Sequence, residues 1–166
     1  GSKAISIEPS KEAFEVEFQL NYSNDLIGNQ KNQINFYNEN LKDIYSSRTF
    51  CLYEDIETIK KQGLAKGGSL DNAIVVKGKE ILNKEGLRND KEFVNHKILD
   101  LAGDFLLSGY RIIGKVKCTE GGHHLSNTFL KEIFKEESNF EEFTVNNVEL
   151  FKKNIKISVN KLAVSA

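Results

Sequence analysis

The sequence contains no methionine and no tryptophan, and only one proline and two cysteines among its 166 residues. Cys51 and Cys118 are too few for a disulfide framework, and they do not form a Cys-x-x-Cys motif. We therefore predict that both are small core residues of a protein in a reducing compartment, the cytoplasm.

Long apolar runs and an excess of one charge are also absent. No run approaches the ~20 residues of a membrane-spanning helix, and the first residues lack the apolar core of a signal peptide. Lys and Arg number 23 against 24 Asp and Glu, which gives a net charge of -1. Without a basic field or an aromatic–basic cluster, RNA is not an expected partner. We predict a soluble protein with no membrane span and no nucleic-acid partner.

A natural coding sequence begins with methionine, so the absence of this residue predicts that the chain is a piece of a longer protein. Its first residues, Gly1-Ser2, are typical of the remnant of a cleaved tag. We assign residues 1–3 to this remnant and the start, and residues 4–166 to a single domain. A hydrophobic share of 39% and a charged share of 28% are ordinary for one globular domain.

Hydrophobic periodicity predicts a succession of strands and helices. Phe14, Val16, Phe18 and Leu20 alternate with polar residues and predict a half-buried strand at residues 13–20. The other predicted elements are a partner strand at 33–37, a short helix at 38–45 capped by Asn38 or Asn40, a helix at 53–62 closed by Gly63, a strand at 73–76, a long helix from about 89 to 107, a strand at 111–118, a helix from 123 to about 136, and strands at 144–150 and 155–159. This order predicts an α+β domain with two layers.

The long predicted helix carries a narrow polar stripe, and the spacing of Asn89 and Glu92 predicts a capping box at its start. At ~100° per residue, His96, Asp100 and Asp104 fall within one arc, while apolar residues fill most of the remaining circumference. This pattern predicts the wall of a cleft. A His and an Asp one turn apart can bind one divalent ion, but the same spacing also occurs in exposed ion pairs.

Two shorter groupings are open to more than one interpretation. Residues 120–125 join two glycines to His123 and His124, which suits either a close approach of the backbone to a ligand or a turn with exposed histidines. In Arg48-Thr49-Phe50 a hydroxyl lies between a cation and an aromatic ring, a combination that has no functional meaning by itself.

Taken together, four segments resemble, in order and spacing, the second domain of the UDP-3-O-acyl-N-acetylglucosamine deacetylase family. They are Ser47-Arg48-Thr49-Phe50, residues 63–69, residues 92–100 and Gly122-His123. The resemblance covers about residues 14–134. It implies a two-layer sandwich of a mostly antiparallel sheet with helices on one face, of the type named after the second domain of a ribosomal protein. A small βαβ insert is expected at about residues 50–82.

Members of this family are zinc hydrolases that commit bacteria to lipid A synthesis, and zinc lies between their two similar domains. The resemblance implies that His96 and Asp100 are two zinc ligands. A third ligand, a histidine, and the glutamate that acts as general base belong to the first domain. We therefore expect the protein's own N-terminal domain as partner, a monomer, and a fragment that is inactive alone.

The implied reaction is hydrolysis of the 2-acetamido group of UDP-3-O-acyl-N-acetylglucosamine, with release of acetate. By the resemblance, protonated His123 stabilises the oxyanion and gives a proton to the amine, while Asp104 orients His123. Thr49 matches a hydroxyl that bonds the oxyanion.

Other positions match substrate contacts of the family. Lys97 matches a lysine near the substrate's phosphates, and Phe50 borders the passage for the acyl chain. Tyr22 either stacks on uracil or is an exposed tyrosine at a strand end. The segment at residues 52–76 matches the insert that wraps the acyl chain, with Ile56, Leu64, Gly68, Ser69 and Ala73.

One position departs from the family pattern. Glu120 stands where relatives commonly have a lysine that meets the diphosphate, and Arg111 or Lys117 can replace that lysine only if the fold brings them close. The choice of His123 over His124 rests on the Gly-His match. The alternative to an enzyme is a non-catalytic module that binds an acyl chain or a nucleotide.

Overall fold

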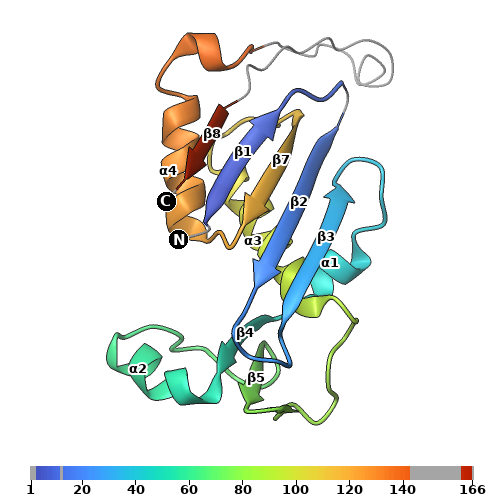
Figure 1. Ribbon diagram of the computed structural model, residues 1–166, viewed down its shortest axis with the longest axis vertical. Helices are drawn as coiled ribbons and strands as arrows, with labels where there is room; N and C mark the ends of the chain where they lie inside the picture. Colours follow the sequence, from blue (N-terminus) through green and yellow to red (C-terminus); the bar gives the residue numbers. More distant parts are fainter. Residues whose placement is uncertain (1–2, 12, 143–161, 166) are drawn as a thin grey trace.

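The computed structural model describes residues 3–11, 13–142 and 162–165, which form two β-sheets and four α-helices (Figure 1). The larger sheet has the order β3-β2-β7-β1-β8. Its strands are β1 (Ala4–Glu8), β2 (Phe14–Asn21), β3 (Asn29–Asn35), β7 (Gly114–Thr119) and β8 (Leu162–Ser165). β2 and β7 are parallel, and the other neighbouring pairs are antiparallel. This sheet is therefore mostly antiparallel, as predicted.

Helices α3 (Glu92–Leu106) and α4 (His123–Ile133) cover one face of the larger sheet (Figure 1). The alternation in β2 is confirmed, because Phe14, Val16, Phe18 and Leu20 are all buried beneath these helices. The helices contribute buried side chains to the same core, listed here as Phe93, Val94, Ile98, Leu101, Phe105, Leu125, Phe129 and Leu130. The observed arrangement is consistent with the predicted two-layer α+β sandwich.

The predicted partner strand at 33–37 is misplaced. β3 runs from Asn29 to Asn35 and pairs with β2 along its whole length, so the connecting loop is shorter than expected. Six of its seven residues are polar, and Ile34 is the exception. Backbone pairing with β2 fixes this strand, and backbone pairing leaves no trace in hydrophobic periodicity. β1 was not predicted, although Ile5 and Ile7 on it are buried.

A second sheet with the order β4-β5-β6 lies at one end of the larger one (Figure 1). β4 (Thr49–Leu52) and β5 (Ala73–Lys77) are parallel, and β6 (Glu80–Ile81) pairs with β5. The predicted helix at 53–62 is split into a 3-10 turn, η1 (Tyr53–Asp55), and α2 (Ile56–Lys61). Gly63 follows α2 with a φ of 74°, the left-handed conformation expected after a helix. Together β4, α2 and β5 form a βαβ unit.

The starts of two helices differ from the predictions. In α1 (Lys42–Ser46), Asn40 does bond the backbone N–H of Lys42, but the predicted helix begins too early. α3 begins at Glu92 without the predicted capping box, because the Glu92 carboxylate binds Arg48 and the N–H of Arg88 instead. The strands predicted at 144–150 and 155–159 lie outside the described residues.

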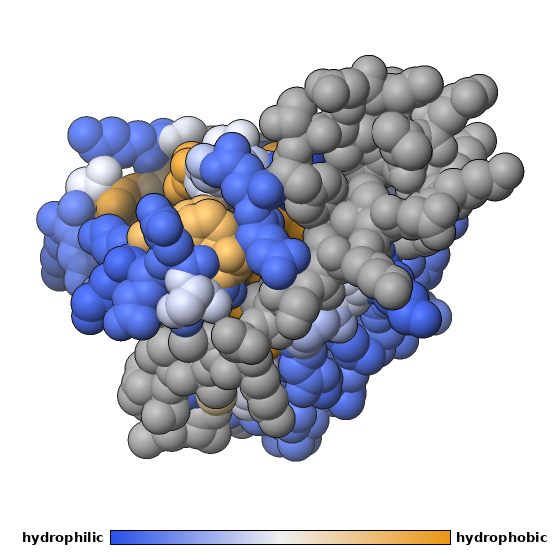
Figure 2. Space-filling model, turned by 90° about the horizontal axis from the view of Figure 1, so that it is seen from above, coloured by the Kyte–Doolittle hydropathy of each residue, from blue (hydrophilic) through white to orange (hydrophobic). Residues whose placement is uncertain are grey.

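Figure 2 shows the face seen from above in Figure 1, where apolar surface is visible near the centre with hydrophilic residues beside it. Among the helices that the structure describes, none has both the length and the apolar character that crossing a membrane requires. Both cysteines have free thiols, and Cys118 belongs to the core as predicted, whereas Cys51 is only half-buried.

The two glycines before α4 differ in their surroundings, and this difference can be tested by mutation. A Cβ on Gly121 would collide with Sγ of buried Cys118 and approach the ring of Phe18 to 3.7 Å. A Cβ on Gly122 would meet nothing within 4 Å. Because overpacking a core costs about 1–3 kcal/mol, Gly121→Ala should lower the free energy of unfolding in urea by that amount. Gly122→Ala is the matched control and should change the free energy of unfolding by only about a few tenths of a kcal/mol. Equal stability of the two variants contradicts this prediction.

Candidate functional site

A nitrogen donor and an oxygen donor lie side by side on one face of α3. Nε2 of His96 is 3.3 Å from Oδ1 of Asp100, and the side chains are 16% and 20% exposed. The pKa of His96 lies below its ordinary value, mainly because burial disfavours the charged ring. The negative charge of Asp100 acts to raise this pKa, but its effect is smaller than that of burial. The neutral imidazole that results is the form that binds a metal ion.

The donor chemistry of His96 and Asp100 fits part of a zinc site. Zinc binds imidazole nitrogen and carboxylate oxygen, and its catalytic sites use three protein ligands. Across residues 3–11, 13–142 and 162–165, no group of three or more His, Cys, Asp or Glu side chains is placed to hold a metal. Among the described residues, His96 and Asp100 therefore have donor atoms of the type that zinc binds, but they do not form a three-ligand set.

Lys97 shares the Asp100 carboxylate with His96. Its Nζ lies 3.1 Å from Oδ2 of Asp100, whereas His96 faces Oδ1. The Asp100 carboxylate is thus held between two partners on the same helix: the Lys97 ammonium group, three residues earlier, and the His96 imidazole, four residues earlier. This contact restricts the rotamer of Asp100 and keeps its Oδ1 beside His96.

One turn further along α3, Asp104 binds the first residue of α4. Nδ1 of His123 lies 2.9 Å from Oδ1 and 3.0 Å from Oδ2 of Asp104. The Asp104 side chain is 10% exposed and that of His123 is 66% exposed. A carboxylate bonded to Nδ1 fixes the orientation of the ring, while its outer edge stays open. The histidine that contacts Asp104 is therefore His123.

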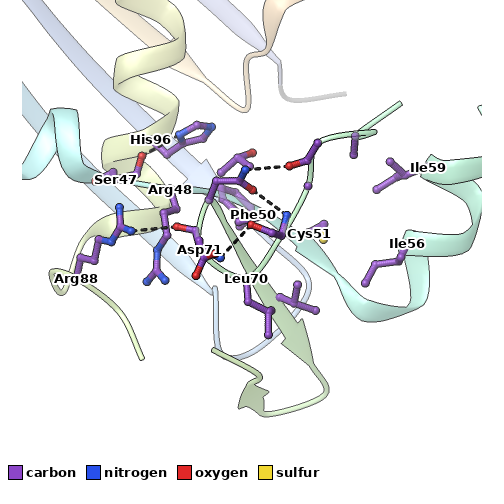
Figure 3. Close-up of a pocket in the computed structure, with 18 of the residues that line it drawn as sticks. Ser47, Arg48, Phe50, Cys51, Ile56, Ile59, Leu70, Asp71, Arg88 and His96 are labelled. Atoms are coloured by element: carbon purple, nitrogen blue, oxygen red, sulfur yellow. Dashed lines mark hydrogen bonds between the residues drawn. The ribbon is translucent and has the colours of Figure 1, made fainter. Parts of the chain in front are cut away.

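The larger of two pockets has a volume of about 840 Å³ and lies between β4, α2 and the loop before β5 (Figure 3). Ile56 and Ile59 project from α2 toward it, and Phe50 borders it. Of the five insert residues expected from the sequence, Ile56, Gly68, Ser69 and Ala73 line this pocket, whereas Leu64 does not. A volume of this size and an apolar lining suit a ligand with a hydrocarbon part.

The smaller pocket, of about 350 Å³, shares Thr49, Phe50 and His96 with the larger one. Tyr22 and Lys97 complete its predicted lining. The structure therefore brings five predicted residues together around the smaller pocket. Asp100 and Asp104 on α3 and His123 at the start of α4 are not part of either lining. Tyr22 is half-buried and packs edge-on against Phe50, with ring centroids 5.9 Å apart.

Glu120 lines the smaller pocket with its backbone in the left-handed region, at a φ of 51°. Nδ2 of Asn21 donates a hydrogen bond of 3.0 Å to its carboxylate. The two candidate substitutes for a lysine at this position lie elsewhere. Lys117 pairs with Glu8 at 3.0 Å, and Arg111 lies over the ring of Tyr37. Neither residue is part of the lining of either pocket.

Sequence reasoning missed a buried ion pair beneath the site. Arg48 is 3% exposed and Glu92 is fully buried, and Nε of Arg48 donates to Oε1 of Glu92 over 2.9 Å. Nη1 of Arg48 also pairs with Glu85. Arg48 and Glu92 are 44 positions apart in the sequence. Hydrophobic periodicity cannot reveal a contact between two single charged residues at such a separation. The only signal in the sequence was that Arg48 and Glu92 both lie in the segments that carry the family resemblance.

Comparison with known proteins places this chain beside one group of enzymes. Residues 1–135 match the family model described as LpxC, UDP-3-O-acyl N-acetylglycosamine deacetylase. The UDP-3-O-acyl-N-acetylglucosamine deacetylase of Campylobacter jejuni (strain RM1221) is 39% identical over 142 residues, which cover 85% of this chain and 48% of the relative. Proteins of the same name from Psychrobacter sp. (strain PRwf-1) and Aliarcobacter butzleri (strain RM4018) are 39% and 38% identical, covering 87% and 84% of this chain and 50% and 46% of the relatives. The chain spans about half the length of these relatives.

The buried pair predicts an acid-dependent stability difference. Burial acts to raise the pKa of Glu92, but hydrogen bonds from Arg48 and from the N–H of Arg88 outweigh it, so its pKa lies below the ordinary 4.5. The pair therefore stabilises the fold above pH 4.5, and this contribution is lost as the pH falls through the lowered pKa. Arg48→Ala leaves a buried unpaired carboxylate and should cost about 3–5 kcal/mol at neutral pH.

The free energy of unfolding in urea, measured for wild type and Arg48→Ala at neutral and acidic pH, tests this. The difference between them should shrink on acidification, because protonation of Glu92 removes the unpaired charge from the variant. Glu85→Gln, which removes only the exposed outer partner, is the control and should change little. A difference that stays constant with pH refutes the assigned role of Glu92.

Proposed function

The chain belongs to the UDP-3-O-acyl N-acetylglycosamine deacetylase family, and from this premise we propose that it is the second half of a zinc-dependent enzyme. Its substrate is UDP-3-O-acyl-N-acetylglucosamine, from which the whole enzyme releases acetate in the committed step of lipid A synthesis. One observation supports this most directly: His96, Asp100 and Asp104 lie on consecutive turns of α3, where His96 contacts Asp100 and Asp104 contacts His123 of α4. The two free cysteines support the proposed cytoplasmic location.

In this proposal, His96 and Asp100 hold the metal together with a third ligand from the other half of the protein. When bound, zinc acts as a Lewis acid toward the amide carbonyl. A glutamate of the other half removes a proton from the attacking water. The carbonyl carbon gains the water oxygen and loses the amide nitrogen, so that acetate and a free amine are the products.

His123 is the proposed proton donor of this reaction. Its Nδ1 is held by Asp104, which leaves Nε2 on the exposed edge of the ring to deliver a proton to the leaving nitrogen. The positive charge of the imidazolium also stabilises the oxyanion before the C–N bond breaks. Thr49, at the wall shared by the two pockets, donates its hydroxyl hydrogen to the same oxyanion.

The pockets support an assignment of the substrate's two ends. The larger pocket has an apolar lining from Phe50, Ile56 and Ile59 and is proposed to hold the acyl chain. The smaller one contains Lys97 and Tyr22 and is proposed to hold part of the UDP-sugar, with Lys97 near the phosphates. Glu120 places a negative charge in this lining, which weakens attraction to a diphosphate there.

Zinc titration by calorimetry on the chain tests the ligand assignment. Because two protein ligands are fewer than a complete site, the chain should bind zinc weakly, and His96→Ala should abolish this binding. His124→Ala is the matched control and should not change the affinity. Tight one-to-one binding that survives His96→Ala contradicts the assignment, and binding of an acyl chain without any effect of zinc would favour a non-catalytic module.

In the full-length protein, His123→Ala should lower kcat by about 10²–10⁴-fold, the range of general acid catalysis, with a much smaller change in KM. Asp104→Asn should also lower kcat, because a neutral amide forms a weaker hydrogen bond with Nδ1 of His123 than a carboxylate does and holds the ring less firmly. Steady-state kinetics of acetate release measures both constants. Near-wild-type turnover of His123→Ala refutes its role as the acid.

A further inference from the structure

The peptide unit between Ser47 and Arg48 is held from both sides by α3. The N–H of Arg48 donates to Oε1 of Glu92 over 3.0 Å, and the carbonyl oxygen of Ser47 lies 3.3 Å from Nδ1 of His96. Glu92 and His96 are one turn apart on the helix. Because a trans peptide points its N–H and C=O in opposite directions, one planar unit bridges both side chains.

Glu92 is fixed more firmly than a surface carboxylate. It is fully buried, and its two oxygens accept hydrogen bonds from Nε and Nη2 of Arg48, at 2.9 and 3.2 Å, and from the N–H of Arg88, at 2.6 Å. Nη2 of Arg48 also donates to the carbonyl oxygen of Gly86 over 2.7 Å. The acceptor that holds the N–H of Arg48 therefore cannot move without breaking several other bonds.

A carbonyl oxygen can only accept a hydrogen bond, so the 3.3 Å contact with Ser47 is a hydrogen bond when the proton is on Nδ1 of His96. The neutral ring then presents a lone pair at Nε2, the nitrogen 3.3 Å from Oδ1 of Asp100. We propose that Glu92 and Arg48 are positioning residues, which hold the Ser47 carbonyl so that His96 keeps the Nδ1–H tautomer and turns Nε2 toward Asp100.

This inference rests on the proposed function only in giving the lone pair of Nε2 a metal ion to bind. The tautomer itself is a property of the metal-free chain. A partner that bonds the far nitrogen of a histidine ligand fixes the ring's orientation, and losing such a partner typically weakens metal binding by about 10–100-fold. We call this peptide unit, held by Glu92 and His96, the Ser47–Arg48 clamp. Thr49, the first residue of β4, follows it directly, so the clamp also influences where the Thr49 hydroxyl lies.

The test uses the chain labelled with ¹⁵N in histidine, without metal, at a pH where the rings are neutral. The chain has three histidines, and the spectrum of His96→Ala identifies the signals of His96. Long-range ¹H–¹⁵N correlation shows which ring nitrogen carries the proton. Wild type should show Nδ1–H at His96. An Nε2–H tautomer in wild type overturns the proposal, whatever the variants do.

Glu92→Gln and Glu85→Gln form a matched pair, since both side chains contact the Arg48 guanidinium but only Glu92 accepts the N–H of Arg48. Glu92→Gln should shift His96 toward the Nε2–H form and weaken zinc binding by about tenfold. Glu85→Gln should leave both unchanged. A folded Glu92→Gln chain with the wild-type tautomer and affinity overturns the proposal.

Two further results separate this inference from the proposed function. If Glu92→Gln does not fold, Arg48→Lys takes its place: it keeps the charge but loses the two-pronged contact that fixes the Glu92 carboxylate, so it should shift His96 toward the Nε2–H form. A folded Arg48→Lys chain with the wild-type tautomer contradicts the positioning role of Arg48. If the Nδ1–H tautomer depends on Glu92 but the wild-type chain binds no zinc, the positioning role stands and the metal assignment fails.

Discussion

The buried ion pair between Arg48 and Glu92 connects the two parts of the structure on which the candidate site depends. Arg48 immediately precedes β4 of the smaller sheet, and Glu92 is the first residue of α3 on the larger one. An ion pair without solvent exposure is costly unless each charge has several partners, and here the guanidinium contacts two carboxylates and a backbone carbonyl. The geometry of the site depends on this pair because His96 and Thr49 lie one turn and one residue away from it.

The second constraint is the parallel pairing of β2 with β7. It places the end of β7 beside the end of β2, so the chain must turn immediately to enter α4. Gly121 allows this turn because a larger residue would collide with Cys118, and Glu120 before it adopts a positive φ. The turn delivers His123 as the first residue of α4, next to Asp104 on α3. A local packing requirement in the core therefore determines the position of the proposed proton donor.

The sequence predicted those elements in which burial follows a regular period. β2 and α3 were found because their apolar residues repeat every two residues or follow the helical turn. β3 was misplaced because its pairing is made by backbone groups under polar side chains. The stripe of His96, Asp100 and Asp104 was visible for the same periodic reason, but roles for these residues came only from the resemblance. The Ser47–Arg48 clamp depends on a peptide plane and on a charge pair distant in sequence, and neither produces a pattern in the residues.

The charges on α3 show why a helix packed against a core can carry this stripe. Two carboxylates at i and i+4 repel each other and lower the stability of a helix. In α3 each of the two carboxylates has its own partners. Lys97 and His96 lie beside Asp100, and His123 lies beside Asp104. Two of these partners are on α3 and one comes from α4, so the packing of α4 against α3 supplies the partner of Asp104. The stripe is therefore stable only when the two helices are docked, and the fold that forms the core also assembles the candidate site.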